Sequence, residues 1–233
     1  MNKGLFITGT DTGIGKTFIT GGLLRVLKAG AVNACPMKPA ESGCKIFQGQ
    51  LIPADAVKLL KAAGLKESLD LVNPYRLRNP LAPAVAAGIE GLSIKKAKIL
   101  SAYKILSNKY DTVLVEGAGG LMVPLNSRYC FADLAADMGL PLLIVARPGL
   151  GTINHTLLTI EAARARGIEI AGVVFNHAEG GRQGLSVKSN PDVISKLGRV
   201  RIFGTVPHCK DHKASLTEKI FAEILCAAGQ KLI

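Results

Sequence analysis

Short apolar runs separated by amphipathic stretches make up most of this 233-residue chain. The runs are rich in valine, isoleucine and leucine and do not alternate with polar residues, which is typical of strands buried on both faces of a parallel sheet. The stretches between them place apolar residues three and four apart, which is typical of helices with one buried face. Strands are predicted at 5–8, 32–37, 112–116, 140–146, 168–175 and 200–206. Helices are predicted at 16–28, from Pro53 onward, and at 93–107, 131–138, 154–166 and 215–228.

The alternation of strands and helices predicts an α/β fold, a parallel sheet flanked by helices on both faces with right-handed crossovers. No linker, internal repeat or low-complexity segment interrupts the pattern, so residues 1–233 are predicted to form a single domain. Ser93 is the expected N-cap of the helix over 93–107, and the proline-rich segments 73–75 and 79–83 are expected to form turns.

The first apolar run leads directly into Gly9-Thr-Asp-Thr-Gly-Ile-Gly-Lys-Thr17, and a helical pattern starts at once. Strand, glycine-rich turn with Gly-Lys-Thr, and helix occur in this order in phosphate-binding loops, where backbone N–H groups surround the phosphate oxygens. Lys16 would reach the β- and γ-phosphates, and the Thr17 hydroxyl would bind Mg²⁺. Five residues, rather than the usual four, separate Gly9 from Gly15, so the loop is a variant that is one residue longer. The alternative is an ordinary glycine-rich turn before a helix.

Four polar segments follow predicted strands, and this shared position links them. They are residues 9–17, 38–42, 116–120 and 176. The carboxyl ends of parallel strands meet at one edge of a sheet, so these segments are expected to converge on one crevice.

Three charged residues near these segments are candidates for chemistry. Glu116 ends an apolar strand, and Asp55 opens a helix; a nucleotide-bound Mg²⁺ usually takes one or two carboxylates, so both are predicted metal ligands. The alternatives are helix capping for Glu116 and a favourable interaction with the helix dipole for Asp55. Lys38 follows a strand and precedes Pro39, which stiffens its loop, so it is predicted to act at the site rather than to be a solvated loop lysine.

The net charge of +12 raises the question of a nucleic-acid or membrane partner. No basic run exceeds two residues and aromatic residues make up only 5% of the chain, so neither a nucleic-acid nor a membrane partner is predicted. Part of the charge would attract anionic ligands such as a nucleotide. No apolar run reaches the length of about 18 residues that a membrane span needs, and the N-terminus leads straight into a strand, so a cytoplasmic protein is expected.

The chain resembles the dethiobiotin synthetase family in six segments that occur in the same order over nearly its whole length. They are the longer phosphate loop at 9–17, Lys38-Pro-Ala-Glu-Ser-Gly43, Val72-Asn-Pro-Tyr75, Val115-Glu-Gly-Ala-Gly-Gly120, Gly151-Thr-Ile-Asn-His155 and Asn176. The resemblance implies a P-loop NTPase-like fold and a ligase of biotin biosynthesis, a cyclo-ligase that converts 7,8-diaminopelargonate, CO2 and ATP to dethiobiotin, ADP and phosphate. CO2 would form a carbamate on one amine, the carbamate would take the γ-phosphoryl group, and the second amine would close the ureido ring.

The resemblance also implies roles for individual residues. Lys16 and Lys38 would stabilise the carbamate and the transferring phosphoryl group, and Thr12 and Ser42 would lie near the diamine and the carbamate. The implied Mg²⁺ ligands are Thr17, Asp55 and Glu116. The implied phosphate contacts are Gly13, Ile14, Gly15, Lys16, Thr17, Gly117, Ala118 and Gly119. Asn176 and Pro207 would hold adenine. Gly151, Thr152 and Asn154 would receive the substrate carboxylate from across a homodimer interface. Gly13 stands where some family members carry an acidic side chain, so a role for that side chain is absent here.

Three other classes of protein are alternatives to this interpretation. A partition-type P-loop ATPase switch protein has a related fold, but it uses a lysine near the start of its phosphate loop, and positions 10–14 contain none. An amidase of the cobyrinate type would need an added glutamine-hydrolysing domain, for which the chain is too short. A nucleic-acid-binding protein would show salt-dependent DNA binding.

Overall fold

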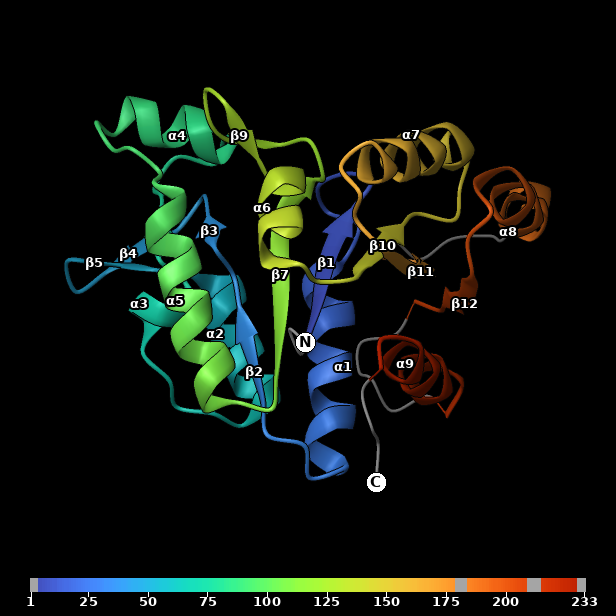
Figure 1. Ribbon diagram of the computed structural model, residues 1–233, viewed down its shortest axis with the longest axis horizontal. Helices are drawn as coiled ribbons and strands as arrows, with labels where there is room; N and C mark the ends of the chain where they lie inside the picture. Colours follow the sequence, from blue (N-terminus) through green and yellow to red (C-terminus); the bar gives the residue numbers. More distant parts are fainter. Residues whose placement is uncertain (1–3, 179–183, 209–214, 230–233) are drawn as a thin grey trace.

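A six-stranded sheet forms the centre of the molecule in the computed structural model, which describes residues 4–178, 184–208 and 215–229. The strand order is β12-β11-β10-β1-β7-β2, and every neighbouring pair is parallel. The strands are β1 (Gly4–Gly9), β2 (Ala34–Met37), β7 (Thr112–Gly120), β10 (Leu142–Ala146), β11 (Ile170–Asn176) and β12 (Ile202–Val206). The predicted α/β fold is therefore confirmed (Figure 1).

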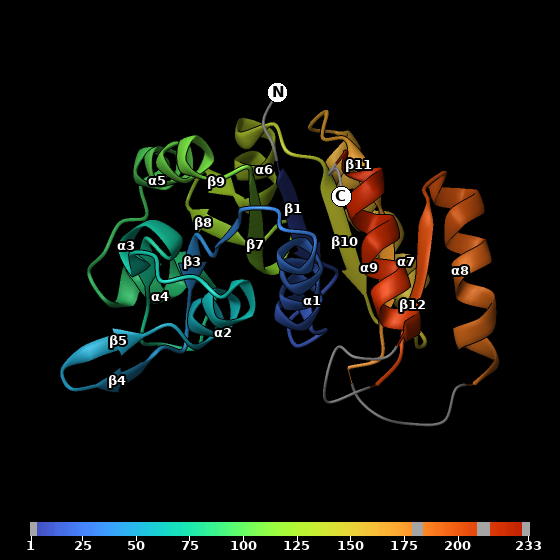
Figure 2. The same cartoon turned by 90° about the horizontal axis from the view of Figure 1, so that it is seen from below.

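Helices cover both faces of this sheet, because its strands are buried on both sides. Along β1, Leu5 and Ile7 belong to one apolar cluster and Phe6 belongs to the other. The cluster around Leu5 and Ile7 includes residues of α1 (Lys16–Ala29), α2 (Ala54–Ala63) and α9 (Ser215–Ala227). The cluster around Phe6 includes residues of α5 (Lys96–Lys109), α6 (Phe131–Met138), α7 (Thr152–Arg164) and α8 (Leu185–Gly198). Figure 2 shows α1 and α9 in front of the strands when the molecule is seen from below.

Small elements cluster beside the β2 edge of the sheet. β3 (Ala40–Glu41) pairs with β6 (Tyr75–Arg76), and β4 (Lys45–Phe47) forms a hairpin with β5 (Gln50–Ile52). The short helices α3 (Leu69–Val72) and α4 (Pro83–Ile89) lie in the same connection, and β8 (Pro124–Asn126) pairs with β9 (Tyr129–Cys130) after β7. The β4–β5 hairpin projects from the body of the molecule (Figure 2). The sequence predicted only turns and one helix for most of this region.

One local prediction was wrong, and one helix was not predicted. Ser93 is not an N-cap: α5 begins at Lys96, and the N–H of Lys95 donates to the Tyr75 hydroxyl at 2.9 Å, so a residue from another element supplies the acceptor. Helix α8 was missed altogether, because Pro191 lies inside it and proline is a strong helix breaker in sequence. The other predicted helices and strands are present, and their ends differ by at most three residues except at β7, which continues four residues beyond the predicted end, to Gly120.

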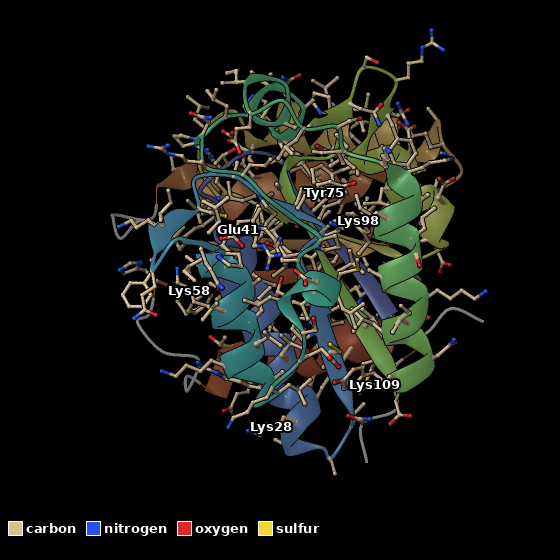
Figure 3. The ribbon with its side chains drawn as sticks, turned by 90° about the vertical axis from the view of Figure 1, so that its left-hand side faces the viewer. Lys28, Glu41, Lys58, Tyr75, Lys98 and Lys109 are labelled. Carbon is tan, nitrogen blue, oxygen red and sulfur yellow. The ribbon has the colours of Figure 1, made fainter. Side chains whose placement is uncertain are left out.

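Exposed lysines are spread over several elements. Lys28 lies on α1, Lys58 on α2, and Lys98 and Lys109 on α5, and Figure 3 shows them at separate places on one side of the molecule. Lys98 lies over the Tyr75 ring, 4.8 Å from its centroid.

In the part of the chain that the structure describes, no helix has both the length and the apolar character to cross a membrane.

Candidate active site

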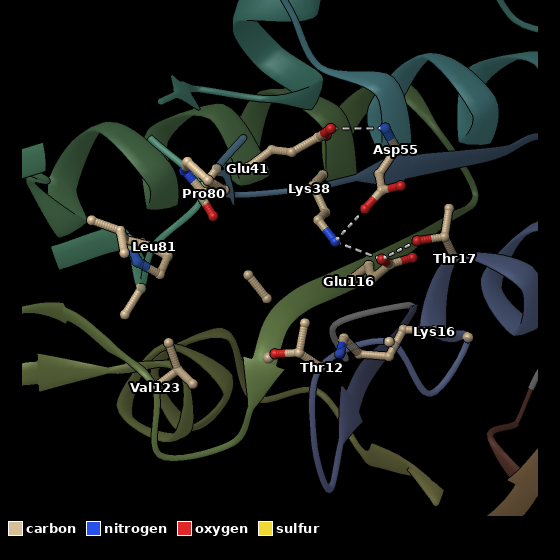
Figure 4. Close-up of a pocket in the computed structure, with 17 residues that line it drawn as sticks. Thr12, Lys16, Thr17, Lys38, Glu41, Asp55, Pro80, Leu81, Glu116 and Val123 are labelled. Carbon is tan, nitrogen blue, oxygen red and sulfur yellow. Dashed lines mark hydrogen bonds and ion pairs between the residues drawn. The ribbon is translucent and has the colours of Figure 1, made fainter. Parts of the chain in front are cut away.

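A cavity of about 650 Å³ opens at the carboxyl ends of β1, β2 and β7. It brings together the phosphate loop, the loop after β2, the start of α2 and the end of β7 (Figure 4). The predicted residues that line it are Thr12, Gly13, Gly15, Lys16, Thr17, Lys38, Ser42, Asp55, Glu116, Ala118 and Gly119. Three of the four segments that were expected to converge, 9–17, 38–42 and 116–120, therefore meet at one cavity, as the topology of a parallel sheet predicts, whereas Asn176 lies outside it.

The phosphate loop joins β1 to α1 and leaves the helix N-terminus open. Gly15, the N-cap, has φ of 87°, and a Cβ built there would come within 2.1 Å of the Asn176 amide nitrogen, so only glycine fits. Within the described ranges no side chain caps α1 and no acidic residue lies in its first turn. Unpaired N–H groups and the positive end of the helix dipole at this point favour an anion.

The side chain of Lys16 folds back over the phosphate loop. Its ammonium donates a hydrogen bond to the carbonyl of Asp11 at 3.0 Å, and the residue is buried. Burial, followed by the nearby positive charge of Lys38, lowers the pKa of Lys16 from 10.5 to about 8. A phosphate group beside it would favour the charged ammonium and reverse this shift.

Side chains from four separate segments, one of them the phosphate loop, meet beside Lys16. The Lys38 ammonium donates to Glu116 Oε1 at 2.6 Å and lies 3.4 Å from Asp55 Oδ2 (Figure 4). The Thr17 hydroxyl donates to the same Glu116 oxygen at 2.8 Å. Burial alone would lower the pKa of Lys38, but the carboxylates of Glu116 and Asp55 outweigh it and raise that pKa, so the ammonium stays charged.

These oxygens fit a magnesium ion. Glu116 Oε2 is buried and has no hydrogen-bond partner among the described residues, which is costly for a carboxylate oxygen unless a ligand completes it. Carboxylate and hydroxyl oxygens are the ligands that Mg²⁺ takes, usually together with phosphate oxygens and waters. The described residues contain no group of three or more His, Cys, Asp or Glu side chains suited to a metal. Thr17, Asp55 and Glu116 would therefore hold Mg²⁺ together with a nucleotide, rather than as a closed protein site.

Asn176 and Pro207 meet on the far side of Gly15. They line a second cavity of about 220 Å³ with Phe18, His177, Ala178 and His208. The Asn176 amide donates to the carbonyl of Ile14 at 2.8 Å, which joins the end of β11 to the phosphate loop. This cavity adjoins the phosphate loop at Gly15, so it lies where the base of a bound nucleotide could extend.

Five further predicted residues line neither of these two cavities. Ile14 contributes the carbonyl that Asn176 contacts, and the Gly117 carbonyl accepts from Lys38 at 3.3 Å. Gly151, Thr152 and Asn154 form the start of α7 and line none of the cavities described above. Thr152 is buried, with its hydroxyl 3.3 Å from that of Thr156, whereas Asn154 is exposed.

The sequence missed two parts of the cavity. Glu41 lines it, although the sequence assigned no role to this residue. The apolar part of the wall comes from Leu81, Val123 and the segment 80–83, which the sequence predicted only as a turn. The sequence of a turn does not indicate which of its side chains face a cavity, so segment 80–83 could not be assigned to the site. Glu41 could have been a candidate, because it precedes Ser42.

Comparisons with known proteins agree with the geometry. Residues 3–215 match the model of a family described as an AAA domain. The ATP-dependent dethiobiotin synthetase of Thermodesulfovibrio yellowstonii is 44% identical over 215 residues, which cover 89% of this chain and 90% of that protein. The protein of the same name from an Anaeromyxobacter strain is 47% identical over 195 residues, which cover 84% of this chain and 85% of that protein.

A solved structure of a ParA family ATPase from Chlorobium tepidum is similar in fold, with a TM-score of 0.54 and 15% identity over 99% of this chain and 93% of that one. At this identity the likeness extends to the P-loop NTPase-like fold alone, so it does not favour the partition-type alternative. The sequence relatives, which match over most of their length, decide the family. The chain belongs to the family of ATP-dependent dethiobiotin synthetases.

Proposed function

We propose that this protein closes the ureido ring of dethiobiotin from 7,8-diaminopelargonate, CO2 and ATP, with release of ADP and phosphate. The observation that carries the proposal is the meeting of Lys38 and Glu116 beside the phosphate loop, in a chain that belongs to this family. Little covalent chemistry falls to the protein. Its residues position the reacting groups and stabilise the charge that develops on them.

The first step forms a carbamate. An unprotonated amine of the substrate adds to CO2 and loses a proton, which leaves an anionic carbamate. The Lys38 ammonium, held charged between Glu116 and Asp55, faces the cavity where this anion would lie. Thr12 and Ser42 line the same cavity and offer hydroxyl groups to the diamine and the carbamate.

The second step transfers a phosphoryl group. A carbamate oxygen attacks the γ-phosphorus of ATP, the bond to the β-phosphate oxygen breaks, and a carbamic–phosphoric anhydride and ADP result. Lys16 and the backbone of residues 13–17 would hold the transferring group and the leaving ADP. When bound by Thr17, Asp55 and Glu116, Mg²⁺ would neutralise charge on the phosphate oxygens.

The last step closes the ring. The second amine attacks the carbonyl carbon, the bond to the phosphate oxygen breaks, and the amine proton is released. The ureido ring and inorganic phosphate are the products. The apolar wall of Leu81 and Val123 suits the methylene chain of the substrate, because both side chains face the cavity.

The far end of the substrate requires a second anion site. We infer a homodimer in which the start of α7 of one subunit, residues 151–154, receives the substrate carboxylate bound mainly by the other subunit. Gly151 has φ of 86° and opens α7, and although the Thr152 N–H donates to the Gly149 carbonyl at 3.4 Å, the positive end of the helix dipole at this point favours an anion. A cytoplasmic location, a single domain over 1–233 and the absence of nucleic-acid and membrane partners remain predictions.

Direct detection of product tests the proposal. The protein is incubated with diaminopelargonate, bicarbonate, ATP and Mg²⁺, and dethiobiotin is measured by mass spectrometry while phosphate release is followed in parallel. We expect phosphate release to require the diamine and to match dethiobiotin formation one to one. Equal phosphate release without the diamine would contradict the proposal and favour a switch ATPase.

A further inference from the structure

The N-terminus of α2 is capped from a distant part of the chain. Its N-cap residue is Pro53, which has no side-chain acceptor for the unpaired N–H groups of the first turn. The Glu41 carboxylate takes this place: Oε1 accepts from the Asp55 N–H at 2.8 Å and Oε2 accepts from the Ala56 N–H at 3.1 Å. Each carboxylate oxygen thus contacts one amide of the helix, and Figure 4 shows the contact with Asp55.

Glu41 is a rigid anchor for this contact. It is 6% exposed, and its backbone belongs to β3, which pairs with β6. The Glu41 carbonyl accepts from the Leu77 N–H at 2.8 Å, so hydrogen bonds hold both the backbone and the side chain of this residue. Figure 3 shows Glu41 among the interior side chains rather than at the outline of the molecule.

A buried glutamate is a costly way to cap a helix. Serine or threonine at position 53 would cap α2 locally with an uncharged hydroxyl, without taking a charge out of water. Burial raises the pKa of Glu41, although the two amide hydrogen bonds oppose this shift. Removing the Glu41 carboxylate from water costs free energy, and the contact reaches a helix 14 residues further along the chain. The stability of α2 alone does not explain such a contact.

The same contact joins the two sides of the proposed metal site. Asp55, whose amide Glu41 holds, points its carboxylate to within 3.4 Å of the Lys38 ammonium. Lys38 lies three residues before Glu41 in the same loop. The loop after β2 and the first turn of α2 are therefore connected both through Lys38 with Asp55 and through Glu41 with the Asp55 amide.

We propose that Glu41 is a positioning residue: it fixes Asp55 for the metal-bound nucleotide and ties it to the loop that carries Lys38. This inference rests on the proposed function only for the identity of the reaction, since metal and nucleotide binding can be measured without turnover. Both Glu41 oxygens are already occupied by amides, which favours positioning over direct contact with the diamine.

The experiment measures metal binding without catalysis. Mn²⁺ is titrated into the full-length protein with a non-hydrolysable ATP analogue, and bound Mn²⁺ is followed by electron paramagnetic resonance. We expect Glu41→Ala to weaken Mn²⁺ binding by about tenfold or more, the range for groups that orient a metal ligand, and Glu41→Gln to fall in between because it keeps one acceptor oxygen. Metal-free binding of the analogue should stay unchanged. Ser68→Ala, which removes the cap of α3 outside the site, is the matched control and should leave Mn²⁺ binding at the wild-type value.

A second variant separates positioning from plain capping. Pro53→Ser in the Glu41→Ala background restores a local cap but not the link to the Lys38 loop. We expect it to recover thermal stability and to leave Mn²⁺ binding weak. Recovery of Mn²⁺ binding in this double variant, or unchanged Mn²⁺ binding in Glu41→Ala, would overturn the proposal. If Glu41→Ala does not fold, the same comparison is made with Glu41→Gln, for which an unchanged Mn²⁺ affinity would likewise overturn it.

Steady-state kinetics complete the test. For dethiobiotin formation, we expect the Mg²⁺ concentration at half-maximal rate to rise in the Glu41 variants while KM for the diamine stays within about twofold. A rise in the diamine KM alone would identify Glu41 as a substrate contact and overturn the positioning role. Wild-type protein that binds Mn²⁺ and nucleotide but makes no dethiobiotin would refute the proposed function and leave the Mn²⁺ comparison valid.

Discussion

Two neighbouring parts of the main cavity, the phosphate end and the charged cluster of Lys38, Asp55 and Glu116, are built in different ways. The phosphate end is made by one continuous segment, residues 9–17, and relies largely on backbone groups and the end of a helix. The charged cluster beside it depends on side chains from separate segments: Lys38 and Glu116 are 78 residues apart in the chain, and Thr17, at the end of the phosphate loop, is 99 residues from Glu116. A backbone site tolerates changes in most side chains, whereas a site made of opposed charges depends on each of them. Nucleotide binding and chemistry should therefore respond to different substitutions.

Lys38→Gln should have the largest effect on turnover. Removing the charge that faces the carbamate and the transferring phosphoryl group should lower kcat by about 10²- to 10³-fold, the range seen when a preorganised charge contact is lost. ATP affinity, measured by calorimetry, should change little because Lys38 lies outside the phosphate loop. Lys58→Gln is the matched control: Lys58 also lies beside Asp55, at 3.9 Å, but is exposed. Wild-type turnover in Lys38→Gln would remove this lysine from the site.

Glu116→Gln should come next and should affect the metal dependence. The amide keeps the size of the side chain but loses the charge opposite Lys38 and a metal-binding oxygen. We expect the Mg²⁺ concentration at half-maximal rate to rise by at least about tenfold. The midpoint temperature of thermal unfolding should change little, because the substitution acts mainly on metal binding. A variant whose Mg²⁺ dependence equals that of the wild type would exclude Glu116 as a metal ligand.

Mixing two weakened variants tests whether both ends of the substrate are held by one subunit. Asn154→Ala alone should bind ATP normally and the diamine more weakly. When it is mixed with Lys38→Gln, half of the dimers are heterodimers with one intact site of two, so about a quarter of wild-type activity should return. The mixture is compared with each variant alone. No recovery after proven subunit exchange, or tight diamine binding by a monomer, would rule out shared sites.

The phosphate end should show a pH dependence of its own. The pKa of Lys16 is lowered to about 8 in the free protein, and phosphates favour its charged form, so ATP binding should raise that pKa. Above pH 8 binding should therefore take up a proton, and ATP affinity should fall as the pH rises from about 8 to about 10. Calorimetry in buffers of different ionisation enthalpy measures this uptake. Lys16→Arg is the control, since arginine stays charged in this range. Proton release on binding would contradict the assignment.

Arg147→Ala should have the smallest effect. Its guanidinium lies 2.7 Å from the Asp11 carboxylate, but about half of each side chain is exposed, so solvent screens the pair. Exposed ion pairs contribute less than about 1 kcal/mol, and thermal unfolding should shift little. Since the loop is held by backbone geometry, ATP affinity should also stay within about threefold. A larger loss would mean that this pair, rather than the backbone, fixes the phosphate loop.

The sequence predicted the phosphate end well because its signals are local. Gly15, Lys16 and Thr17 lie in one motif between a strand and a helix, and the order of the elements placed Lys38 and Glu116 at the same edge. The role of Glu41 could not be predicted, because its two hydrogen bonds depend on the position of α2, and helix capping is usually sought within the neighbouring residues. The same cause explains the wrong cap at Ser93, where the Tyr75 hydroxyl replaces a local acceptor. Helix α8 was missed for the opposite reason, since tertiary contacts override the local effect of Pro191.

The central position of β1 has a consequence for how the protein is made. This strand pairs only with β7 and β10 among the described strands, through residues 113–120 and 142–145. During synthesis, β1 leaves the ribosome before the other strands and must wait until residues 113–120 have emerged before its first neighbour exists. Contacts between segments so distant in sequence form slowly, and an unpaired apolar strand is prone to aggregate in the meantime. Nascent chains stalled before β7 should therefore hold a phosphate-loop sequence that binds no ATP, and ATP binding should appear only once β10 has emerged.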